Sequence, residues 1–278
     1  MRKWKIFVTF FKKLYPDHYT NDTSLNWDNF TFVKVNDDYD LEVDDQHSYD
    51  IFFEHDFTTF NPDLQKKGYH ENSVLYHIYK NGAHLPYDYI GFIEYDHVLA
   101  PGFTNRIQSV LDHTEKDLIF AFNKFSFDQL WSQGVLMNPN DPNKETGDPE
   151  SEWNCIRVVL EDYNQFFDTR FKIGDLIERD CFPICHCFLL PTKIFERIMN
   201  FHAFIMESGR IENYHIHNWR AKAGLMERYL AVELALEQAA IIDAIQLEHR
   251  EYPIRVLKPD WFRPSLLRRL RRCFQKRT

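Results

Sequence analysis

Two acidic residues follow an apolar stretch of the chain, and their spacing suits a metal ion. The stretch 89–93 reads Tyr-Ile-Gly-Phe-Ile, and Glu94 and Asp96 come after it, two positions apart. In a β-strand, residues two apart point to the same side. Carboxylate oxygens are the ligands that Mg²⁺ and Mn²⁺ prefer. The pair therefore indicates a divalent-cation site, although an acidic exit from an ordinary strand gives the same pattern.

Two residues near the C-terminal end could act together with this pair. Glu227 lies in the segment 223–230, Ala-Gly-Leu-Met-Glu-Arg-Tyr-Leu, which opens a predicted helix after a polar loop. The helix dipole favours a carboxylate there without any function, but a carboxylate can also take a proton from an attacking hydroxyl group. His249 follows a predicted strand at 241–247. An imidazole at that place is either a third metal ligand or a surface histidine.

The elements that must position these residues alternate between strand-like and helix-like patterns. Such alternation is typical of an α/β domain, in which ligands bind beyond the carboxyl ends of the strands. The acidic pair follows one of these ends. Predicted strands cover 5–11, 51–53, 89–95, 118–122, 185–190 and 241–247, and predicted helices cover 71–80, 152–166, 192–201 and 225–239.

We expect one domain over residues 1–257 and a basic tail over residues 258–278. No internal repeat and no Gly/Ser-rich linker divides the chain. The stretch 136–152 is rich in Asn, Pro, Asp and Glu, which predicts a long surface loop. The tail combines Lys and Arg with leucines at helical spacing. It is therefore either solvated or in weak contact with an anionic membrane surface.

The composition predicts a folded, soluble protein that does not bind nucleic acid. Hydrophobic residues make up 44% of the chain and charged residues 27%, as in ordinary globular proteins. The net charge of −9 argues against a basic surface for a phosphate backbone over the body of the protein. Cysteines number five, which is odd, and the N-terminal stretch lacks the pattern of a secretory leader. These features predict reduced thiols and a cytoplasmic location.

The acidic pair, the acidic helix residue and the late histidine, in this order, resemble the GT-A glycosyltransferases. By this resemblance Glu94 and Asp96 fall on the family's DxD sequence, with Glu in its first position. Glu227 falls on the acidic residue that acts as base in inverting members, with Arg228 where many members carry a second acid. His249 falls on the metal-binding histidine. The resemblance implies a GT-A-like, Rossmann-type mixed sheet flanked by helices in a single α/β domain.

A narrower likeness concerns bacterial polysaccharide-type glycosyltransferases. In these, a Glu-led helix such as 71–81 precedes a sequence like the Asp-Tyr-Ile-Gly of residues 88–91, and Gly-x-x-x-Glu-Arg comes later. Here Gly224 and the Glu-Arg pair at 227–228 stay close to the later pattern. The relatives continue the strand into His-Tyr-Arg-Arg, whereas residues 94–97 read Glu-Tyr-Asp-His. The chain therefore resembles a divergent relative with an acidic metal site.

The resemblance implies transfer of a sugar from a nucleotide diphosphate donor, a UDP-sugar in the first place, to a glycan or glycoprotein acceptor. Mn²⁺ or Mg²⁺ would bridge the diphosphate. A glutamate base implies inversion at the anomeric carbon of the sugar, although retention stays open. Thr9 and Phe10, at the end of the first strand, would lie near the base or ribose. Glu71, Asn72 and Tyr95 would face the donor. Core packing is the alternative for Phe10, and the helix dipole explains Glu71 equally well.

The stretch 181–187, Cys-Phe-Pro-Ile-Cys-His-Cys, contains two kinds of zinc ligand. A zinc site is not expected, because the spacing matches no paired knuckle and no second Cys/His cluster follows. In the predicted strand, Cys185 and Cys187 share one face and His186 has the other. His186 could then touch an acceptor sugar or pack in the core. Trp219, in the polar loop before Glu227, could stack on a sugar or be buried.

Two other functions compete with glycosyl transfer. A nucleotidyl or phosphosugar transferase would need a Gly-rich N-terminal phosphate loop, but the first glycine of the chain is Gly68. A non-catalytic glycan- or nucleotide-binding scaffold protein would carry the same carboxylates for structural reasons. Metal-dependent binding of UDP separates the scaffold from the enzyme.

Overall fold

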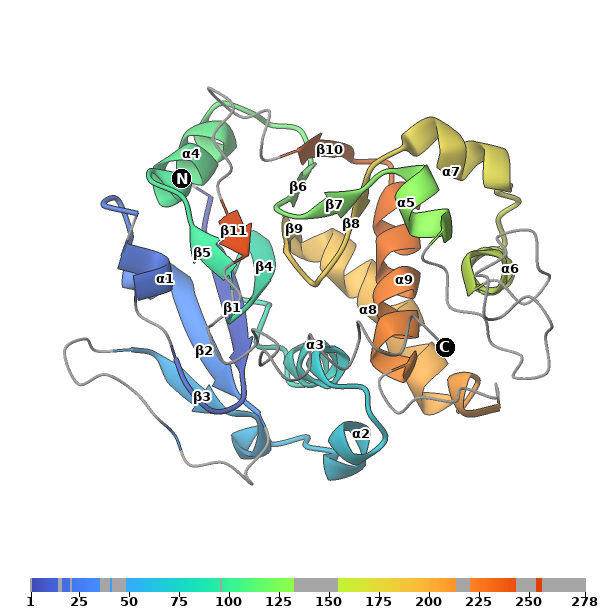
Figure 1. Ribbon diagram of the computed structural model, residues 1–278, viewed down its shortest axis with the longest axis horizontal. Helices are drawn as coiled ribbons and strands as arrows, with labels where there is room; N and C mark the ends of the chain where they lie inside the picture. The colour runs from blue at the N-terminus through green and yellow to red at the C-terminus, as the bar shows by residue number, and fades with distance from the viewer. Residues whose placement is uncertain are drawn as a thin grey trace, which may run out of the picture.

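The computed structural model describes residues 2–14, 17–20, 22–35, 41, 49–95, 97–132, 155–213, 221–243 and 254–256. Within these ranges one mixed sheet has the strand order β10-β6-β9-β4-β1-β2-β3 (Figure 1). Neighbouring strands are parallel, except that β9 is antiparallel to both β4 and β6. The strands are β1 (Trp4–Phe10), β2 (Phe30–Lys34), β3 (Ile51–Phe53), β4 (Tyr89–Glu94), β6 (Leu118–Ala121), β9 (Phe188–Pro191) and β10 (Ala240–Asp243).

Helices cover both faces of the sheet (Figure 1). Side chains alternate along β1, so that Ile6 and Val8 pack against one helical layer and Phe7 against the other. One layer consists of α1 (Asp17–Thr20) and α4 (Phe103–Asp112). The other contains α2 (Pro62–Lys66), α3 (Glu71–Lys80), α5 (Phe127–Ser132), α6 (Cys155–Phe167), α7 (Ile173–Arg179), α8 (Thr192–Glu207) and α9 (Ala221–Leu236). The protein is therefore a single α/β domain with the sheet between two helical layers.

Short elements complete the described part of the chain. Two strand pairs lie outside the main sheet: β5 (His97–Leu99) with β11 (Ile254–Val256), and β7 (Lys124–Phe125) with β8 (Phe182–Pro183). The described residues also form the 3₁₀ helices η1 (Trp27–Asn29), η2 (Glu54–Asp56) and η3 (Ile211–Asn213). No helix in the described ranges is long and apolar enough to cross a membrane.

Most predicted elements are present with ends shifted by a few residues. The helix predicted at 71–80 and the strand predicted at 51–53 are confirmed with the same bounds. The helix predicted at 152–166 is α6, and the helix predicted at 192–201 continues to Glu207. The predicted surface loop at 136–152 and the basic tail lie outside the described residues.

Two differences concern residues of interest. The strand predicted at 185–190 begins only at Phe188, because Cys185 and His186 have φ angles of 55° and 47° and form a turn. The prediction that these two residues point to opposite faces of a strand is therefore wrong. The helix predicted from 225 begins four residues earlier, at Ala221, which places Glu227 in its second turn rather than at its start.

Candidate active site

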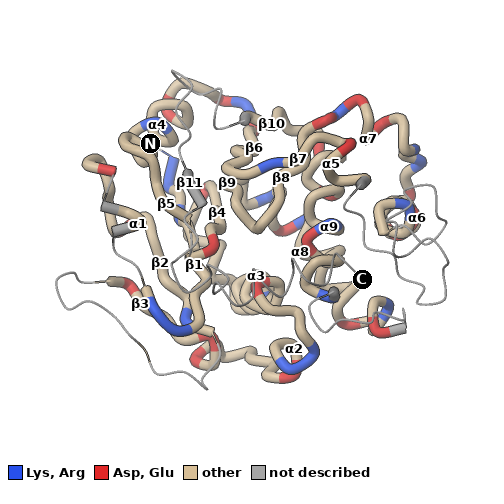
Figure 2. The backbone as a smooth tube through the Cα atoms, viewed as in Figure 1, with Lys and Arg blue, Asp and Glu red and all other residues tan. Residues whose placement is uncertain are grey.

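Three side chains from separate elements meet at the carboxyl edge of β4. Glu94 is the last residue of β4, Glu71 is the first residue of α3, and His186 lies in the turn before β9. One ligand atom from each lies within 4.8 Å of the others, and Nδ1 of His186 is 3.7 Å from Oε1 of Glu94. Figure 2 marks acidic positions at the end of β4, on α3 and on α9. Ligands of open α/β sheets bind at this edge.

The turn that carries His186 is held in an unusual backbone conformation. Both Cys185 and His186 occupy the left-handed region, which costs about 1–3 kcal/mol for each residue other than glycine. The turn is closed by a hydrogen bond from the Cys187 N–H to the Ile184 carbonyl at 3.1 Å. The Cys185 N–H donates to Oε1 of Glu227 at 2.9 Å. These contacts hold the imidazole beside Glu71 and Glu94. Strained backbone of this kind is common at functional sites.

Asn72 connects the cluster to the interior of the helical layer. Its side chain is fully buried, and Oδ1 lies 3.0 Å from Nε2 of His186 and 3.1 Å from Nε2 of His202. Its Nδ2 donates to the Tyr69 carbonyl at 3.1 Å. Because the amide bonds within the protein, the influence of Asn72 on a ligand runs through His186.

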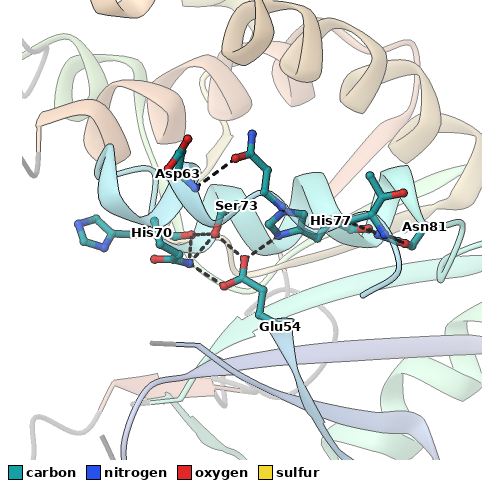
Figure 3. Close-up of polar contacts among 9 residues, drawn as sticks. Glu54, Asp63, His70, Ser73, His77 and Asn81 are labelled. Carbon is teal, nitrogen blue, oxygen red and sulfur yellow. Dashed lines mark hydrogen bonds and ion pairs between the residues drawn. The ribbon is translucent and has the colours of Figure 1, made fainter. Parts of the chain in front are cut away.

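A buried network fixes α3, the helix that begins with Glu71 (Figure 3). Oε1 of Glu54 accepts from the Ser73 hydroxyl at 2.6 Å and from Nδ1 of His77 at 2.8 Å. The Asn61 N–H donates to Nε2 of His77 at 3.0 Å, which leaves the ring proton on Nδ1. Glu54 is 3% exposed, so this carboxylate is compensated by hydrogen bonds rather than by water. The network sets the position of the helix start at the site.

Glu227 approaches the same turn from α9. Its Oε1 accepts from the backbone of Cys185, and its Oε2 accepts from Arg228 at 3.0 Å. The side chain is 19% exposed. Each carboxylate oxygen has two lone pairs, so this arrangement orients the group and leaves it able to accept a further hydrogen bond.

Negative charge predominates among these groups. Burial raises the pKa of Glu94, the contact with His186 opposes this shift, and the charge of Glu71 adds to it, so that the pKa is above its ordinary value. Burial alone lowers the pKa of His186, but its contact with Glu94 and the charges of Glu227 and Glu71 raise it above its ordinary value. Burial and the charge of Glu227 also raise the pKa of the Cys185 thiol. A bound cation would relieve this repulsion, and the oxygen and nitrogen donors present fit a divalent ion.

The other residues predicted at the site lie close to the same edge or outside the described ranges. The Tyr95 N–H donates to the Thr9 carbonyl at 3.1 Å, which joins the ends of β1 and β4. Phe10 is 1% exposed and packs in the core, the alternative that its sequence left open. The neighbouring Phe11 forms an edge contact with Tyr95, with ring centroids 5.4 Å apart. Asp96 and His249 lie outside the described residues.

Neither Glu71 nor His186 was assigned to a metal from the sequence. Glu71 was expected to face the donor, and His186 was expected to touch an acceptor sugar or to pack in the core. The residues that flank His186 include no glycine, Asn or Asp that would signal a left-handed turn. The turn depends instead on Glu227, which is 42 positions away in the chain. The spacing of the stretch 181–187 argues against a zinc site, so the sequence did not place His186 in this cluster.

Comparison with known proteins identifies the fold. The sequence matches no protein-family model and no curated protein. Among solved structures, the bifunctional glycosyltransferase WbbM aligns over 87% of this chain with 14% identity and a TM-score of 0.51. The aligned region spans 44% of WbbM, less than half of that protein. The expected GT-A-type α/β fold is confirmed by this likeness.

Two further solved structures align with lower scores. Mouse xyloside xylosyltransferase 1 matches 86% of this chain and 84% of its own at 8% identity, with a TM-score of 0.36. The mannosyltransferase Ktr4p from S. cerevisiae matches 81% of this chain and 65% of its own at 8% identity, with a TM-score of 0.35. At these scores the two alignments do not bear on the site.

Proposed function

We propose that the protein is a glycosyltransferase that moves a sugar from a nucleotide diphosphate donor, a UDP-sugar in the first place, to a glycan acceptor. The observation that carries the proposal is the set of groups at the carboxyl edge of β4. Glu71, Glu94 and His186 form one cluster there, and Glu227 contacts the same turn. The fold that this chain shares with a glycosyltransferase supports the assignment, although fold alone does not decide function.

The cluster provides a place for the donor diphosphate. Glu71 and Glu94 would hold a divalent cation, Mn²⁺ or Mg²⁺, whose charge neutralises the departing nucleoside diphosphate. The end of β1 at Thr9 lies beside Tyr95, one residue after Glu94. This proximity supports a nucleotide bound across the ends of β1 and β4. Phe11 and Tyr95 are half-buried aromatic residues next to that position in the chain, whereas Phe10 lies in the core. Such rings stack on flat bases.

Glu227 is the proposed base. The acceptor hydroxyl oxygen forms a bond to the anomeric carbon while the bond from that carbon to the diphosphate oxygen breaks. The hydroxyl proton passes to Glu227, and the diphosphate leaves with the bonding electrons. Attack from the face opposite the leaving group inverts the anomeric carbon. The hydrogen bonds from Cys185 and Arg228 support this role by fixing the direction of the carboxylate.

A panel of nucleotide sugars tests the proposal. Each donor is titrated into the wild-type chain with and without Mn²⁺, and both binding and donor hydrolysis are followed. Glu94→Gln removes one proposed ligand charge, and Glu178→Gln, on the exposed face of α7, is the matched control. We expect one donor to bind and hydrolyse with Mn²⁺, the control to behave as wild type, and Glu94→Gln to lose both properties. Binding of no donor would favour the non-catalytic scaffold over the enzyme.

A further inference from the structure

Within the part of the chain that the structure describes, one ring nitrogen of His186 has no hydrogen-bond partner. The side chain is 5% exposed, and its Nδ1 atom is buried and has no hydrogen bond to any described residue. Leaving a buried polar atom without a hydrogen-bond partner is unfavourable. Nδ1 points toward Oε1 of Glu94, 3.7 Å away. The distance is too long for a hydrogen bond and short enough for two ligands of one ion.

The hydrogen bonds of Asn72 determine which ring nitrogen of His186 carries the proton. Nδ2 of Asn72 donates to a backbone carbonyl, so Oδ1 is the atom that faces the two histidines. A carbonyl oxygen only accepts. His186 must therefore donate through Nε2–H, and in the neutral ring Nδ1 carries a lone pair directed at the acidic cluster.

The same amide orients a second buried histidine. Nε2–H of His202 also donates to Oδ1 of Asn72, and Nδ1 of His202 lies 3.4 Å from Oε1 of Glu233. His202 and Glu233 are both fully buried. Since α8 and α9 carry these two residues, the packed interior holds Asn72, and Asn72 in turn holds the ring of His186. Outer partners of this kind are what fix the tautomer of a metal-binding histidine.

We propose that His186, through Nδ1, joins Glu94 and Glu71 as the protein ligands of one divalent transition-metal ion. Ligand atoms about 2.0–2.2 Å from a metal lie about 3–3.5 Å from one another. The observed separations, 3.7 Å for one pair and at most 4.8 Å for all three, need only small side-chain movements to reach this geometry. Three protein ligands leave coordination positions open for phosphate oxygens.

The ligand set favours a particular class of cation. Carboxylates alone suit Mg²⁺ as well as Mn²⁺, whereas an imidazole favours transition metals. One nitrogen and two carboxylates therefore select Mn²⁺ or a similar ion over Mg²⁺. This inference deepens the proposed function by naming its cation, but it is tested on the metal alone.

Metal binding by the full chain provides the test. Mn²⁺ and Mg²⁺ are titrated separately by calorimetry, and bound Mn²⁺ is examined by pulsed electron paramagnetic resonance for coupling to a ligand nitrogen. His186→Asn removes the imidazole with a residue that tolerates a left-handed backbone. His84→Asn is the control, because His84 is another buried histidine near a glutamate, in the loop after the far end of α3. His249→Asn tests the other histidine that the sequence suggests.

We expect wild type to bind Mn²⁺ more tightly than Mg²⁺ and to show nitrogen coupling. His186→Asn should lose the nitrogen coupling and bind Mn²⁺ at least about tenfold more weakly, while His84→Asn and His249→Asn keep both properties.

Absence of Mn²⁺ binding by wild type overturns the proposal, as does coupling that survives in His186→Asn. If His186→Asn does not fold, loss of the coupling in Glu94→Gln supports the site, and its loss in His249→Asn overturns it. Mn²⁺ binding through His186 without donor binding would leave this site intact and reject the transferase.

Discussion

The backbone N–H of Cys185 donates to the carboxylate of Glu227 at 2.9 Å. The proposed base therefore contacts the same turn that carries the proposed histidine ligand. Cys185 and His186 are adjacent and both have positive φ. In the proposed function Glu227 therefore has two roles: it accepts a proton, and it helps to hold the turn that carries the imidazole. A substitution there must separate the two effects.

Replacing Glu227 by Gln should abolish proton acceptance while keeping the turn. The glutamine carbonyl can still accept from the Cys185 N–H, so the backbone contact survives. We expect kcat to fall about 10²–10⁴-fold, the usual contribution of a positioned base, while donor and Mn²⁺ affinities change little. Single-turnover kinetics and calorimetry provide the two measurements.

Comparison with Glu227→Ala separates the role of Glu227 in holding the turn from its role as the proton acceptor. The alanine substitution also removes the acceptor for Cys185, so it should weaken Mn²⁺ binding in addition to catalysis. If Glu227→Gln retained wild-type kcat, Glu227 would not be the base. Equal Mn²⁺ affinity in Glu227→Ala and wild type would show that the turn does not need this contact.

Replacing Asn72 by Leu should disturb both stability and metal binding. The side chains have similar size, but leucine leaves Nε2–H of His186 and of His202 without an acceptor in a buried site. Each unsatisfied donor costs about 1–3 kcal/mol, and loss of such an orienting partner typically weakens metal affinity about 10–100-fold. Thermal melting and Mn²⁺ titration measure the two effects.

Asn72→Asp is the informative comparison for this position. Aspartate keeps an oxygen acceptor for both histidines, so it should retain more Mn²⁺ affinity than Asn72→Leu. If the two variants bind Mn²⁺ equally well, the amide does not orient His186 and the positioning role is rejected.

The elements with strong local signals were predictable. The α3 helix follows its apolar pattern at 71–80, and β4 follows a short apolar run that ends in Glu94. The stretch 30–34, Phe-Thr-Phe-Val-Lys, also has the composition of a strand. It was not predicted, although it forms β2 beside β1.

The arrangement of the site could not be read from the sequence, for a physical reason. Glu71, Glu94 and His186 belong to three elements, and the order of strands in the sheet brings β9 beside β4. The turn at Cys185 is stabilised by a side chain from α9, and the ring of His186 is oriented by Asn72 from α3. Tertiary contacts override the local preference of these residues for extended backbone.

Burial of Glu233 should make stability depend on pH. Burial raises the pKa of this carboxyl above its ordinary value of 4.5, the nearby Glu237 raises it further, and His202 opposes the shift. Above pH 4.5 the unfolded chain releases this proton before the folded chain does. The contribution of Glu233 to stability is therefore present below pH 4.5 and is lost as pH rises through the folded-state pKa.

Glu233→Gln should remove this pH dependence. Glutamine is neutral, and its amide can donate to Nδ1 of His202, whose other nitrogen donates to Asn72. We expect the variant to be more stable than wild type by about 1–3 kcal/mol at pH 8, with a smaller difference at pH 5. Urea denaturation at pH 8 and at pH 5 measures the difference in the free energy of unfolding between the variant and wild type. Glu178→Gln, at an exposed position, is the control. A difference that does not grow with pH would contradict the assignment.

Gly91 permits the close approach of β4 and β9 that brings the turn at Cys185 to the end of β4. A Cβ atom on Gly91 would lie 2.8 Å from the carbonyl oxygen of Phe188 and 2.9 Å from Cγ1 of Ile6. The backbone contact cannot be relieved by rotating a side chain, so Gly91→Ala must move one strand relative to the other. We expect a loss of about 1–3 kcal/mol in the free energy of unfolding, measured by urea denaturation.

The control for this substitution is Gly174→Ala in α7. Apart from its chain neighbours and the helix's own backbone, no described atom lies within 4 Å of a Cβ placed there. Because alanine favours helix over glycine by about 1 kcal/mol, Gly174→Ala should be at least as stable as wild type.

Gly91→Ala should also weaken Mn²⁺ binding, since separating β4 from β9 moves Glu94 away from His186. A Gly91→Ala variant with wild-type stability would show that the strands can absorb the methyl group. Reduced stability with unchanged Mn²⁺ affinity would show that the geometry of the cluster does not depend on strand separation.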